Sequence, residues 1–513
     1  MPDLGIKSNQ SDTVQTRAAK GGFVSGVSFS LTLLLSVIQV PLLLRFWPQE
    51  MYGLWLSVGA LSTLLTTLDA GHQIYVGNLL SRQYVEDRIA FRRTLASAVR
   101  VAGLTSVVQI LLVVAICISG SAQRLVGIVP EHAVDFALAV VIYTVGWIST
   151  GSVGAILVRL FAPTGFFVRS AWWSIGMRLA QFCAVVFAAC LGWGLVKTTL
   201  LFVGAVFVVN VLLFADIRRL YPGLFPWWRG GDLHFGLKNF SRSSVVSFVS
   251  VLDLVSLQGV VLMVASGLGA AVVPLFTTIR TLANTAMQGT GFLLNPIQPD
   301  LVRYHVQREG KKIGDVFGFF WFATGIVMNG GVVAGLFVVE PLYRIWTQGK
   351  LPFNRALFGW LVAAVLVRTL AAPMQTYLTS INHLRALAAT GSVRVAVAIG
   401  GVLGFQSVWG LSGVGGALFA AELFGSLLLP CLFTYKSLAS LGSRLNLSEY
   451  KTASLSVAIA CMAIAGFALD LFFWPWLAGS AILAVVVVAI AQWRTLTPDV
   501  RARALSVTQR RVA

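Results

Sequence analysis

Charged residues are scarce in this sequence. Asp, Glu, Lys and Arg make up 11% of its 513 residues, whereas 57% are hydrophobic and the mean hydropathy is +0.82. Soluble domains carry about 25% charged residues, so this shortage excludes a soluble globular enzyme. The composition indicates a polytopic membrane protein. Its long unbroken apolar runs favour membrane-spanning helices over the alternating pattern of a barrel, so we predict an all-α fold.

Motifs for metal, nucleotide and catalytic chemistry are also missing. The five cysteines lie in apolar runs without a CxxC pair, so we expect neither a metal site nor a disulfide. The sequence contains no GxxxxGK[ST] phosphate-binding loop and no HExxH zinc motif. No loop carries a cluster of carboxylates. We therefore predict no enzyme activity, no catalytic residues and no cofactor, and any transport must draw on an ion gradient or a substrate gradient.

Fourteen apolar runs are long enough to cross a bilayer, which takes about 20 residues. The last two are joined by a short turn at 474–476, so a re-entrant hairpin is the alternative for that pair. The runs are 21–45, 52–80, 95–118, 133–158, 170–192, 197–216, 243–266, 272–297, 314–338, 355–380, 386–406, 411–435, 452–473 and 475–493.

These runs divide the chain into six parts. We expect a cytoplasmic tail, an N-terminal six-helix lobe, a cytoplasmic linker loop, a C-terminal six-helix lobe, two additional helices with the loop before them, and a basic cytoplasmic tail. No loop is long enough for a soluble domain. In this order the parts cover 1–20, 21–216, 217–242, 243–435, 436–493 and 494–513.

Lys and Arg are distributed unevenly between the two sides of the membrane. With the N-terminus in the cytoplasm, the inside segments hold 27 of the 38 Lys and Arg residues, the outside segments hold 6 and the spans hold 5. Cytoplasmic loops are enriched in these residues. We therefore place both termini in the cytoplasm. The net charge of +19 follows from this bias and needs no nucleic-acid partner.

The two halves of the chain resemble each other. Tyr52-Gly53-Leu54-Trp55 begins the second run, and Val273-Pro274-Leu275-Phe276 begins the eighth at a shift of 221 residues. A Trp-Gly-Leu triplet follows Arg178 by 15 residues, and another follows Arg394 by the same 15. Each triplet lies between the fifth and sixth runs of its half. Six spans are an even number, so both halves have the same orientation in the membrane. We therefore predict two pseudo-symmetric lobes related by an axis along the membrane normal.

The carboxylate of Asp69 lies inside an apolar run. Asp69 belongs to the second run, where a polar face forms if the run is one continuous helix. An ionisable residue at bilayer depth is costly and by default indicates a functional site. The alternative is that the small polar residues of this face pack against a neighbouring helix. The face consists of Ser62, Thr66, Asp69, Gln73 and Gly77.

Two arginines lie deep in other runs. Arg280 is in the eighth run, and Arg368 is in the tenth. An arginine at this depth persists only if it is paired or hydrated. The two are therefore either ion-pair partners of Asp253 and Glu422 or a cationic patch for an anionic ligand. We interpret Arg100, Arg178 and Arg394, which lie nearer the ends of their runs, as snorkelling to the interface.

Polar stripes accompany these charges and indicate a cavity. The eighth run carries Thr277, Thr281, Asn284 and Gln288 on one face, and the tenth places Gln375 on the face of Arg368. The seventh run carries Ser247, Ser250 and Asp253. The first run carries Ser25, Ser28, Thr32, Ser36 and Gln39.

Three stretches carry a resemblance to a known family. They are YGLW at the start of the second run, LDAGHQIYVGNLLSR at its end, and TIRTLANTAMQGTGFLLNPIQPDLVR in the eighth. They are similar to the Wzx-type polysaccharide flippases of the MATE-like (MOP exporter) superfamily. The resemblance covers essentially the whole chain, as twelve core spans and two additional C-terminal spans. The family's LDLGLGN-like pattern departs here after Asp69.

The resemblance implies a flippase of the bacterial cytoplasmic membrane that moves an undecaprenyl-diphosphate-linked oligosaccharide outward by alternating access. It implies as partners the lipid-linked glycan, membrane lipids, a coupling proton or sodium ion, and a glycan polymerase or glycosyltransferase. Guanidinium groups pair bidentately with phosphate oxygens, so a cationic cavity suits a diphosphate. The expected substrate-binding residues are Arg280, Arg368, Asn284, Gln288, Gln375, Asp69 and Gln73. The coupling-ion candidates are Asp69, Asp253 and Glu422.

Two other functions stay open. A MATE-like ion-coupled exporter of small molecules or drugs would favour a cavity rich in carboxylates. Away from their ends, the spans hold three carboxylates, Asp69, Asp253 and Glu422, against five arginines. A scaffold for a membrane glycosyltransferase or polymerase complex would not transport anything. A glycan enzyme of this size usually needs a sizeable extramembrane loop with acidic residues, and the sequence has none.

Overall fold

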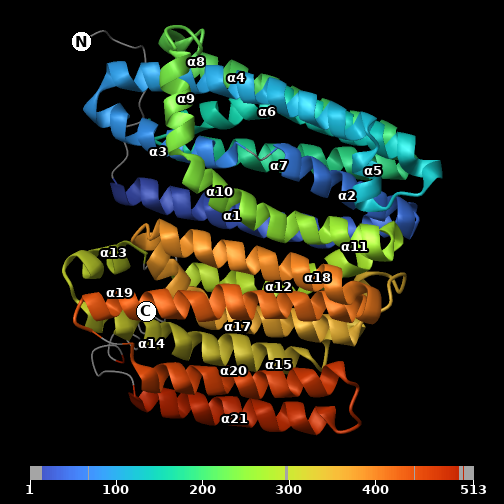
Figure 1. The fold of residues 1–513 in the computed structure, drawn as a ribbon, viewed down its shortest axis with the longest axis vertical. Helices are drawn as coiled ribbons and strands as arrows, with labels where there is room; N and C mark the ends of the chain where they lie inside the picture. The colour runs from blue at the N-terminus through green and yellow to red at the C-terminus, as the bar shows by residue number, and fades with distance from the viewer. Residues whose placement is uncertain (1–13, 67–68, 295–297, 444, 496–500, 502–513) are drawn as a thin grey trace. The chain divides into compact units, whose positions relative to one another are not determined.

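The fold was obtained as a computed structural model that describes residues 14–66, 69–294, 298–443, 445–495 and 501 (Figure 1). All the regular structure in these ranges is helical. The predicted all-α fold is therefore confirmed, and the many long apolar helices are those of a multi-pass membrane protein.

Eleven helical stretches in the described ranges are long and apolar enough to span a membrane, or twelve if a bent pair counts as one span. The pair is α2 (Gln49–Thr66) and α3 (Ala70–Glu86). The eighth run forms α12 (Val273–Leu294), which is not among the twelve. The stretch from Leu384 to Ser440 contains two of the fourteen runs, because Gly410 has φ 55° and reverses the chain there. These two facts account for the difference from fourteen.

The first compact unit covers Met1–Pro274. The boundary between the two compact units therefore lies after the segment 244–268. The sequence pattern assigned this segment to the C-terminal lobe, and the two-lobe symmetry stays a prediction. The main helices of the first unit besides α2 and α3 are α1 (Val14–Phe46), α4 (Arg88–Ile118), α6 (Ala133–Val158), α7 (Phe167–Cys190), α8 (Leu195–Leu220), α9 (Leu233–Arg242), α10 (Ser244–Leu254) and α11 (Val260–Leu268).

Two glycines hold the segment 244–272 against the bent pair. A Cβ atom on Gly53 of α2 would lie 1.8 Å from the carbonyl oxygen of Ala270. A Cβ atom on Gly71 of α3 would lie 2.2 Å from the Cα atom of Ser247. Close backbone approach at small residues is how helices associate in membranes, where no hydrophobic driving force acts between them. Only glycine allows these two contacts.

The expected linker loop at 217–242 folds back on the first unit. Its helix α9 packs on α4, where Gly231 and Gly236 lie against the backbone around Ser97. Asp232 caps α9 by accepting a hydrogen bond from the Phe235 amide at 3.1 Å. The same carboxylate accepts a hydrogen bond from Arg93 at 2.7 Å, and this bond holds the pKa of Asp232 below its usual value. The loop is therefore fixed to α4, both by the packing of α9 and by the ion pair between Asp232 and Arg93.

The second compact unit covers Leu275–Ala513 and is built around α17 (Arg355–Ser380). Most of α17 is buried, and Trp321 donates a hydrogen bond to its Leu370 carbonyl at 2.9 Å. In the described part of the chain, three π-helical segments interrupt the helices, η4 in the first unit and η7 and η8 in the second. They cover Val255–Gly259, Gly325–Gly330 and Glu422–Leu428. The other main helices of the second unit are α12, α13 (Gln298–Val306), α14 (Gly310–Thr324), α15 (Gly331–Gly335), α16 (Val339–Trp346), α18 (Leu384–Ala421), α19 (Leu429–Ser440), α20 (Leu447–Ala468) and α21 (Trp474–Thr495).

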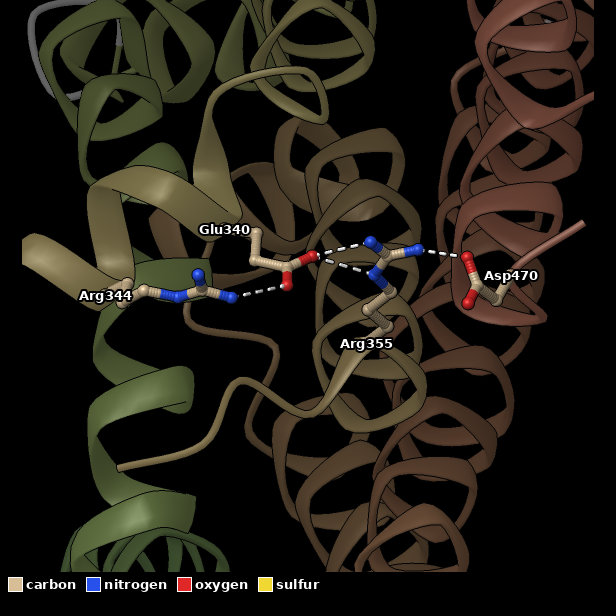
Figure 2. A network of polar contacts seen from close by, with 4 residues as sticks. All are labelled: Glu340, Arg344, Arg355 and Asp470. Atoms are coloured by element: carbon tan, nitrogen blue, oxygen red, sulfur yellow. Dashed lines mark hydrogen bonds and ion pairs between the residues drawn. The ribbon is translucent and has the colours of Figure 1, made fainter. Parts of the chain in front are cut away.

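The two C-terminal helices α20 and α21 lie side by side as a hairpin, and α20 packs on α17 (Figure 1). A network of charges fixes the turn between them (Figure 2). Arg355, at the start of α17, hydrogen-bonds Glu340 of α16 at 2.7 and 2.8 Å and also pairs with Asp470 in the turn. Arg344 approaches the other oxygen of Glu340 at 3.6 Å. One guanidinium thus joins α16, α17 and the C-terminal hairpin.

Replacing Arg355 by Ala is expected to destabilise the second unit. Glu340 is 25% exposed and would lose both short hydrogen bonds. We expect a loss of about 1–3 kcal/mol, between the values for exposed and buried ion pairs. Thermal unfolding of the purified protein measures it, with Arg344→Ala as control because that side chain is 74% exposed and makes one long contact. Equal unfolding temperatures for the two variants would contradict a structural role of Arg355.

Candidate functional site

The first candidate site surrounds Asp69, at the point where the second run bends. The run was predicted to be one helix, and this prediction is wrong, because α2 and α3 meet at an angle of 52°. Asp69 directly precedes α3 and is 3% exposed. The five-residue face expected on a straight helix therefore does not continue through Asp69. In membrane proteins, broken helices are tolerated where protein or a water-filled cavity satisfies the freed backbone groups, and they often form binding sites.

Three neutral side chains surround the Asp69 carboxylate. Ser152 of α6 donates a hydrogen bond to one oxygen at 2.9 Å, and Gln73 of α3 donates to the other at 3.1 Å. The amide of Gln109, on α4, also faces the carboxylate and is 4% exposed. We call Asp69, Gln73, Gln109 and Ser152 the Asp69 cluster. The sequence indicated Asp69 and Gln73 as site residues. It did not indicate Gln109 and Ser152, because these lie on helices that are distant from Asp69 in the sequence.

The second candidate site lies in the second unit and brings two of the predicted arginines together. Arg368 of α17 lies 3.7 Å from Glu422, the first residue of the π-helical segment η8. The charges of Arg368 and Glu422 both act on Arg280 of α12, whose guanidinium also lies over the Phe276 ring. We call Arg280, Arg368 and Glu422 the arginine cluster. Of the two alternatives for Arg368, an ion pair with Glu422 is therefore present, at a distance longer than a hydrogen bond.

The ion pair does not use all the polar atoms of its members. In the described ranges, neither Nε of Arg368 nor Oε2 of Glu422 has a hydrogen-bond partner, and both atoms are buried. Next to them, Gln375 donates a hydrogen bond to the Ser426 carbonyl in η8 at 2.9 Å. A π-helical turn leaves backbone groups without their usual partners and often marks a functional site. Gln375 thus supports the turn that carries Glu422.

The other predicted site residues belong to neither of these two clusters. Asn284 is partly buried on α12, one turn beyond Arg280. Gln288 lies on the same helix, but its side chain is outside the described part of the structure. Asp253 is exposed on α10 of the first unit. These three residues stay predictions as ligands of a substrate or an ion.

Arg178, which was interpreted from the sequence as a snorkelling side chain, is exposed on α7. It lines two cavities of the first unit, with volumes of about 570 and 530 Å³, and donates a hydrogen bond to Thr32 of α1. Ser170, Ser174 and Arg178 follow steps of four residues on α7 and face the polar stripe of α1. This spacing of four residues was the sequence signal that could have placed Arg178 beside the polar stripe of α1. Arg100 is exposed and binds the Trp228 carbonyl at 3.1 Å.

The structure offers no obvious metal site. Among the described residues, no three His, Cys, Asp or Glu side chains lie close enough to hold a metal ion. The first candidate site groups a carboxylate with neutral donors in the first unit, and the second groups two guanidiniums with one carboxylate in the second unit.

No protein-family model matches the chain, and no curated protein matches its sequence. Its fold, however, is similar to solved structures of membrane transporters. The lipid II flippase MurJ in an inward closed conformation aligns with 92% of this chain and 99% of its own, with a TM-score of 0.63 and 14% identity.

Two MATE transporters give related matches. An inward-facing multidrug resistance MATE family transporter of the MOP superfamily aligns with 80% of this chain and 95% of its own, with a TM-score of 0.63 and 13% identity. A mutant MATE transporter from Vibrio cholerae aligns with 83% and 97%, with a TM-score of 0.56 and 11% identity. The chain therefore has the same fold as these MATE transporters and the lipid II flippase.

Proposed function

We propose that this protein is a transporter rather than an enzyme, and that it flips an undecaprenyl-diphosphate-linked oligosaccharide from the inner to the outer leaflet of a bacterial cytoplasmic membrane. The observation that carries this proposal is the arginine cluster. It places two guanidiniums and one carboxylate on apolar helices of the second unit. Such a group has a surplus of positive charge, which an anionic ligand at bilayer depth would neutralise.

A diphosphate suits this cluster chemically. Guanidiniums bind phosphate oxygens in a bidentate geometry, and Nε of Arg368 is one of the donors such a ligand could use. Glu422 would keep the two arginines in place between transport cycles, because like charges repel without it. In this mechanism the cluster holds the headgroup while the protein alternates between inward-open and outward-open states.

The extent of the structural similarity supports a lipid-linked substrate. The lipid II flippase aligns with 92% of this chain, whereas the inward-facing MATE transporter aligns with 80%. The sequence resemblance to Wzx-type flippases indicates a glycan for surface polysaccharide as the specific cargo. A glycan polymerase or glycosyltransferase would then act on the product.

The Asp69 cluster favours a second candidate, an ion-coupled exporter of small molecules like the MATE transporters. A buried carboxylate with three neutral neighbours can take up a proton or a sodium ion. Such a site also serves a flippase that uses an ion gradient. We therefore propose Asp69 as the coupling residue under either function, with Asp253 and Glu422 as the other candidates.

Vesicles test the proposal directly. The purified protein is reconstituted with fluorescent undecaprenyl-diphosphate-linked oligosaccharide, and a membrane-impermeant glycosidase measures how much glycan reaches the outer face. We expect translocation that requires the protein. Active efflux of cationic dyes without glycan translocation would instead establish the drug exporter.

The coupling role of Asp69 leads to a prediction for Asp69→Asn. This substitution keeps the size of the side chain but removes the charge. The Asn oxygen can still accept from Gln73, and its NH2 group can donate to the Ser152 hydroxyl. We expect normal protein abundance and at least about a tenfold loss of gradient-driven translocation, the usual scale for removing a proton-transfer group. Equal rates with and without a gradient in the wild-type protein would reject coupling.

The membrane orientation can be tested with single cysteines. Ser8 lies in the proposed cytoplasmic tail, outside the described residues, and Gln348 is exposed after α16 in the proposed external loop. In a variant that lacks the five native cysteines, an impermeant maleimide should label Cys at 348 in intact cells and Cys at 8 only after lysis. Labelling of both positions in intact cells would reject the proposed topology.

A further inference from the structure

The larger cavity of the first unit has an aromatic wall. Trp55 of α2, Tyr143 of α6 and Phe202 of α8 line it together. The Tyr143 and Phe202 rings are stacked with centroids 5.0 Å apart, and Trp55 meets Phe202 edge to face at 5.5 Å. These contacts hold the rings in fixed positions. A fixed aromatic surface binds flat apolar faces of a ligand at little entropic cost.

The rest of the cavity lining includes polar side chains but few charges. Three amides line the cavity, from Gln39 of α1, Gln181 of α7 and Gln258 of η4, together with the guanidinium of Arg178. The lining residues include neither Asp nor Glu. Each amide offers both donors and acceptors. A cationic drug would find no counter-charge among these residues, whereas a neutral ligand rich in hydroxyl groups would find partners for both its donors and its acceptors.

The cavity continues past Arg178. The second cavity shares Thr32 and Arg178 with the first, and its wall includes Ser28, Ser170 and Ser174. The hydrogen bond from Arg178 to Thr32 lies where the two cavities meet. The larger cavity, at about 570 Å³, is within the range of ligand-binding pockets. The two together therefore offer an extended polar site with an arginine in the middle.

We propose that the larger cavity binds sugar rings of the transported glycan. The apolar face of a ring lies on the aromatic wall, and its hydroxyl groups bond to Gln39, Gln181, Gln258 and Arg178. Longer glycans extend into the second cavity when Arg178 exchanges Thr32 for a sugar hydroxyl. This inference rests on the proposed function and adds the site that recognises the sugar, separate from the arginine cluster that holds the diphosphate.

Binding to the purified full-length protein in lipid nanodiscs tests the inference with three probes. The first is undecaprenyl diphosphate, and the second is the lipid-linked oligosaccharide fraction extracted from cells that lack this protein. The third is the oligosaccharide released from that fraction by mild acid. Native mass spectrometry measures the affinity of each probe for the wild-type protein and for variants.

We expect the wild-type protein to prefer the glycan-bearing lipid over undecaprenyl diphosphate. The double variant Gln181→Ala, Gln258→Ala should lose about tenfold in affinity for the glycan-bearing lipid, as expected for two lost hydrogen bonds. Its affinity for undecaprenyl diphosphate should not change. Arg368→Gln should weaken both lipids by the same factor. Leu179→Ala is the matched control, because Leu179 is exposed on the same helix as Gln181 and lines neither cavity.

The outcomes separate the inference from the proposed function. An unchanged preference in the double variant, or equal affinities of the two lipids for the wild-type protein, would overturn the sugar site and leave the flippase intact. Binding of the released oligosaccharide that the double variant loses supports the sugar site even if neither lipid binds. Failure of all three probes to bind the wild-type protein rejects both.

Discussion

A variant with both Arg280→Gln and Arg368→Gln should lose glycan translocation. Each arginine contributes charge-assisted hydrogen bonds of about 1.5–3 kcal/mol to a diphosphate, which is roughly ten- to hundredfold in affinity per residue. The two losses should together remove transport within the sensitivity of the vesicle assay. Lys at either position should restore only part of the rate, because it keeps the charge but not the bidentate geometry.

The pair between Arg368 and Glu422 complicates this variant, because removing both arginines strands a carboxylate that is 16% exposed. Breaking a buried pair in this way costs roughly 3–5 kcal/mol. A triple variant that adds Glu422→Gln removes the stranded charge and resolves the question. If the arginines bind substrate, the triple variant folds as well as the wild-type protein and still does not transport.

If the arginines serve only structure, the triple variant recovers both abundance and transport, and the substrate role is rejected. Membrane abundance is measured by fluorescence size-exclusion chromatography and transport by the vesicle assay. Arg344→Gln is the control for removing a positive charge, since its side chain is 74% exposed and lies outside both candidate sites.

The positions of the spans could be predicted from hydropathy because lipid imposes a strict rule. Backbone groups must be satisfied within each segment, so a span is a helix of about 20 apolar residues whatever its neighbours are. Even the reversal at Gly410 follows the sequence, where a Trp-Gly-Leu triplet separates two runs. The packing of the linker at 217–242 on α4 was harder to predict, because it depends on glycines that meet another helix.

The candidate sites could be predicted only in part. A carboxylate or arginine at bilayer depth is visible in any sequence, and this identified Asp69, Arg280 and Arg368. Their partners are not visible, because Ser152 lies 83 residues from Asp69 and is an ordinary serine of an apolar helix. Glu422 was one of three carboxylates away from the ends of the spans, so charge balance alone left three candidate partners for the arginines.

The bend of the second run and the surroundings of Arg178 both depend on contacts between helices. The second run was predicted as one helix because its polar residues have helical spacing, but spacing is preserved on both sides of a bend. Arg178 was interpreted as snorkelling from its place in the run, and this interpretation stays untested. The environment of Arg178 depends on α1, which packs on α7 and supplies Thr32. Both features depend on packing between helices, and the residues near each position in the sequence do not reveal that packing.

Replacing Gly71 by Ala should destabilise the first unit more than other conservative substitutions. The new methyl group would lie 2.2 Å from the Cα atom and 2.3 Å from the backbone nitrogen of Ser247. Backbone atoms of a helix cannot move separately, so α3 and α10 must shift apart. Overpacking of this kind usually costs about 1–3 kcal/mol, and we expect the upper end of that range.

The contact at Gly71 also bears on the Asp69 cluster, because Asp69 and Gln73 flank this glycine. His72, between them, lies 3.3 Å from the Ser243 hydroxyl and packs on the Phe240 ring. A shift of α3 away from α10 would therefore move the side chains that hold Asp69. We expect Gly71→Ala to lower both the unfolding temperature in detergent and gradient-driven transport.

The same reasoning applies to Gly53→Ala, whose methyl group would lie 1.8 Å from the Ala270 carbonyl oxygen. The matched control is Gly103→Ala on α4, where a methyl group meets no atom within 4 Å. Ala favours a helix over Gly by about 1 kcal/mol, so this control should be as stable as the wild-type protein or more stable. If all three variants unfold at the wild-type temperature, the segment 244–272 does not pack this closely on α2 and α3. If Gly53→Ala and Gly71→Ala are stable but do not transport, the close contact instead belongs to one state of the transport cycle, and the methyl groups block that state.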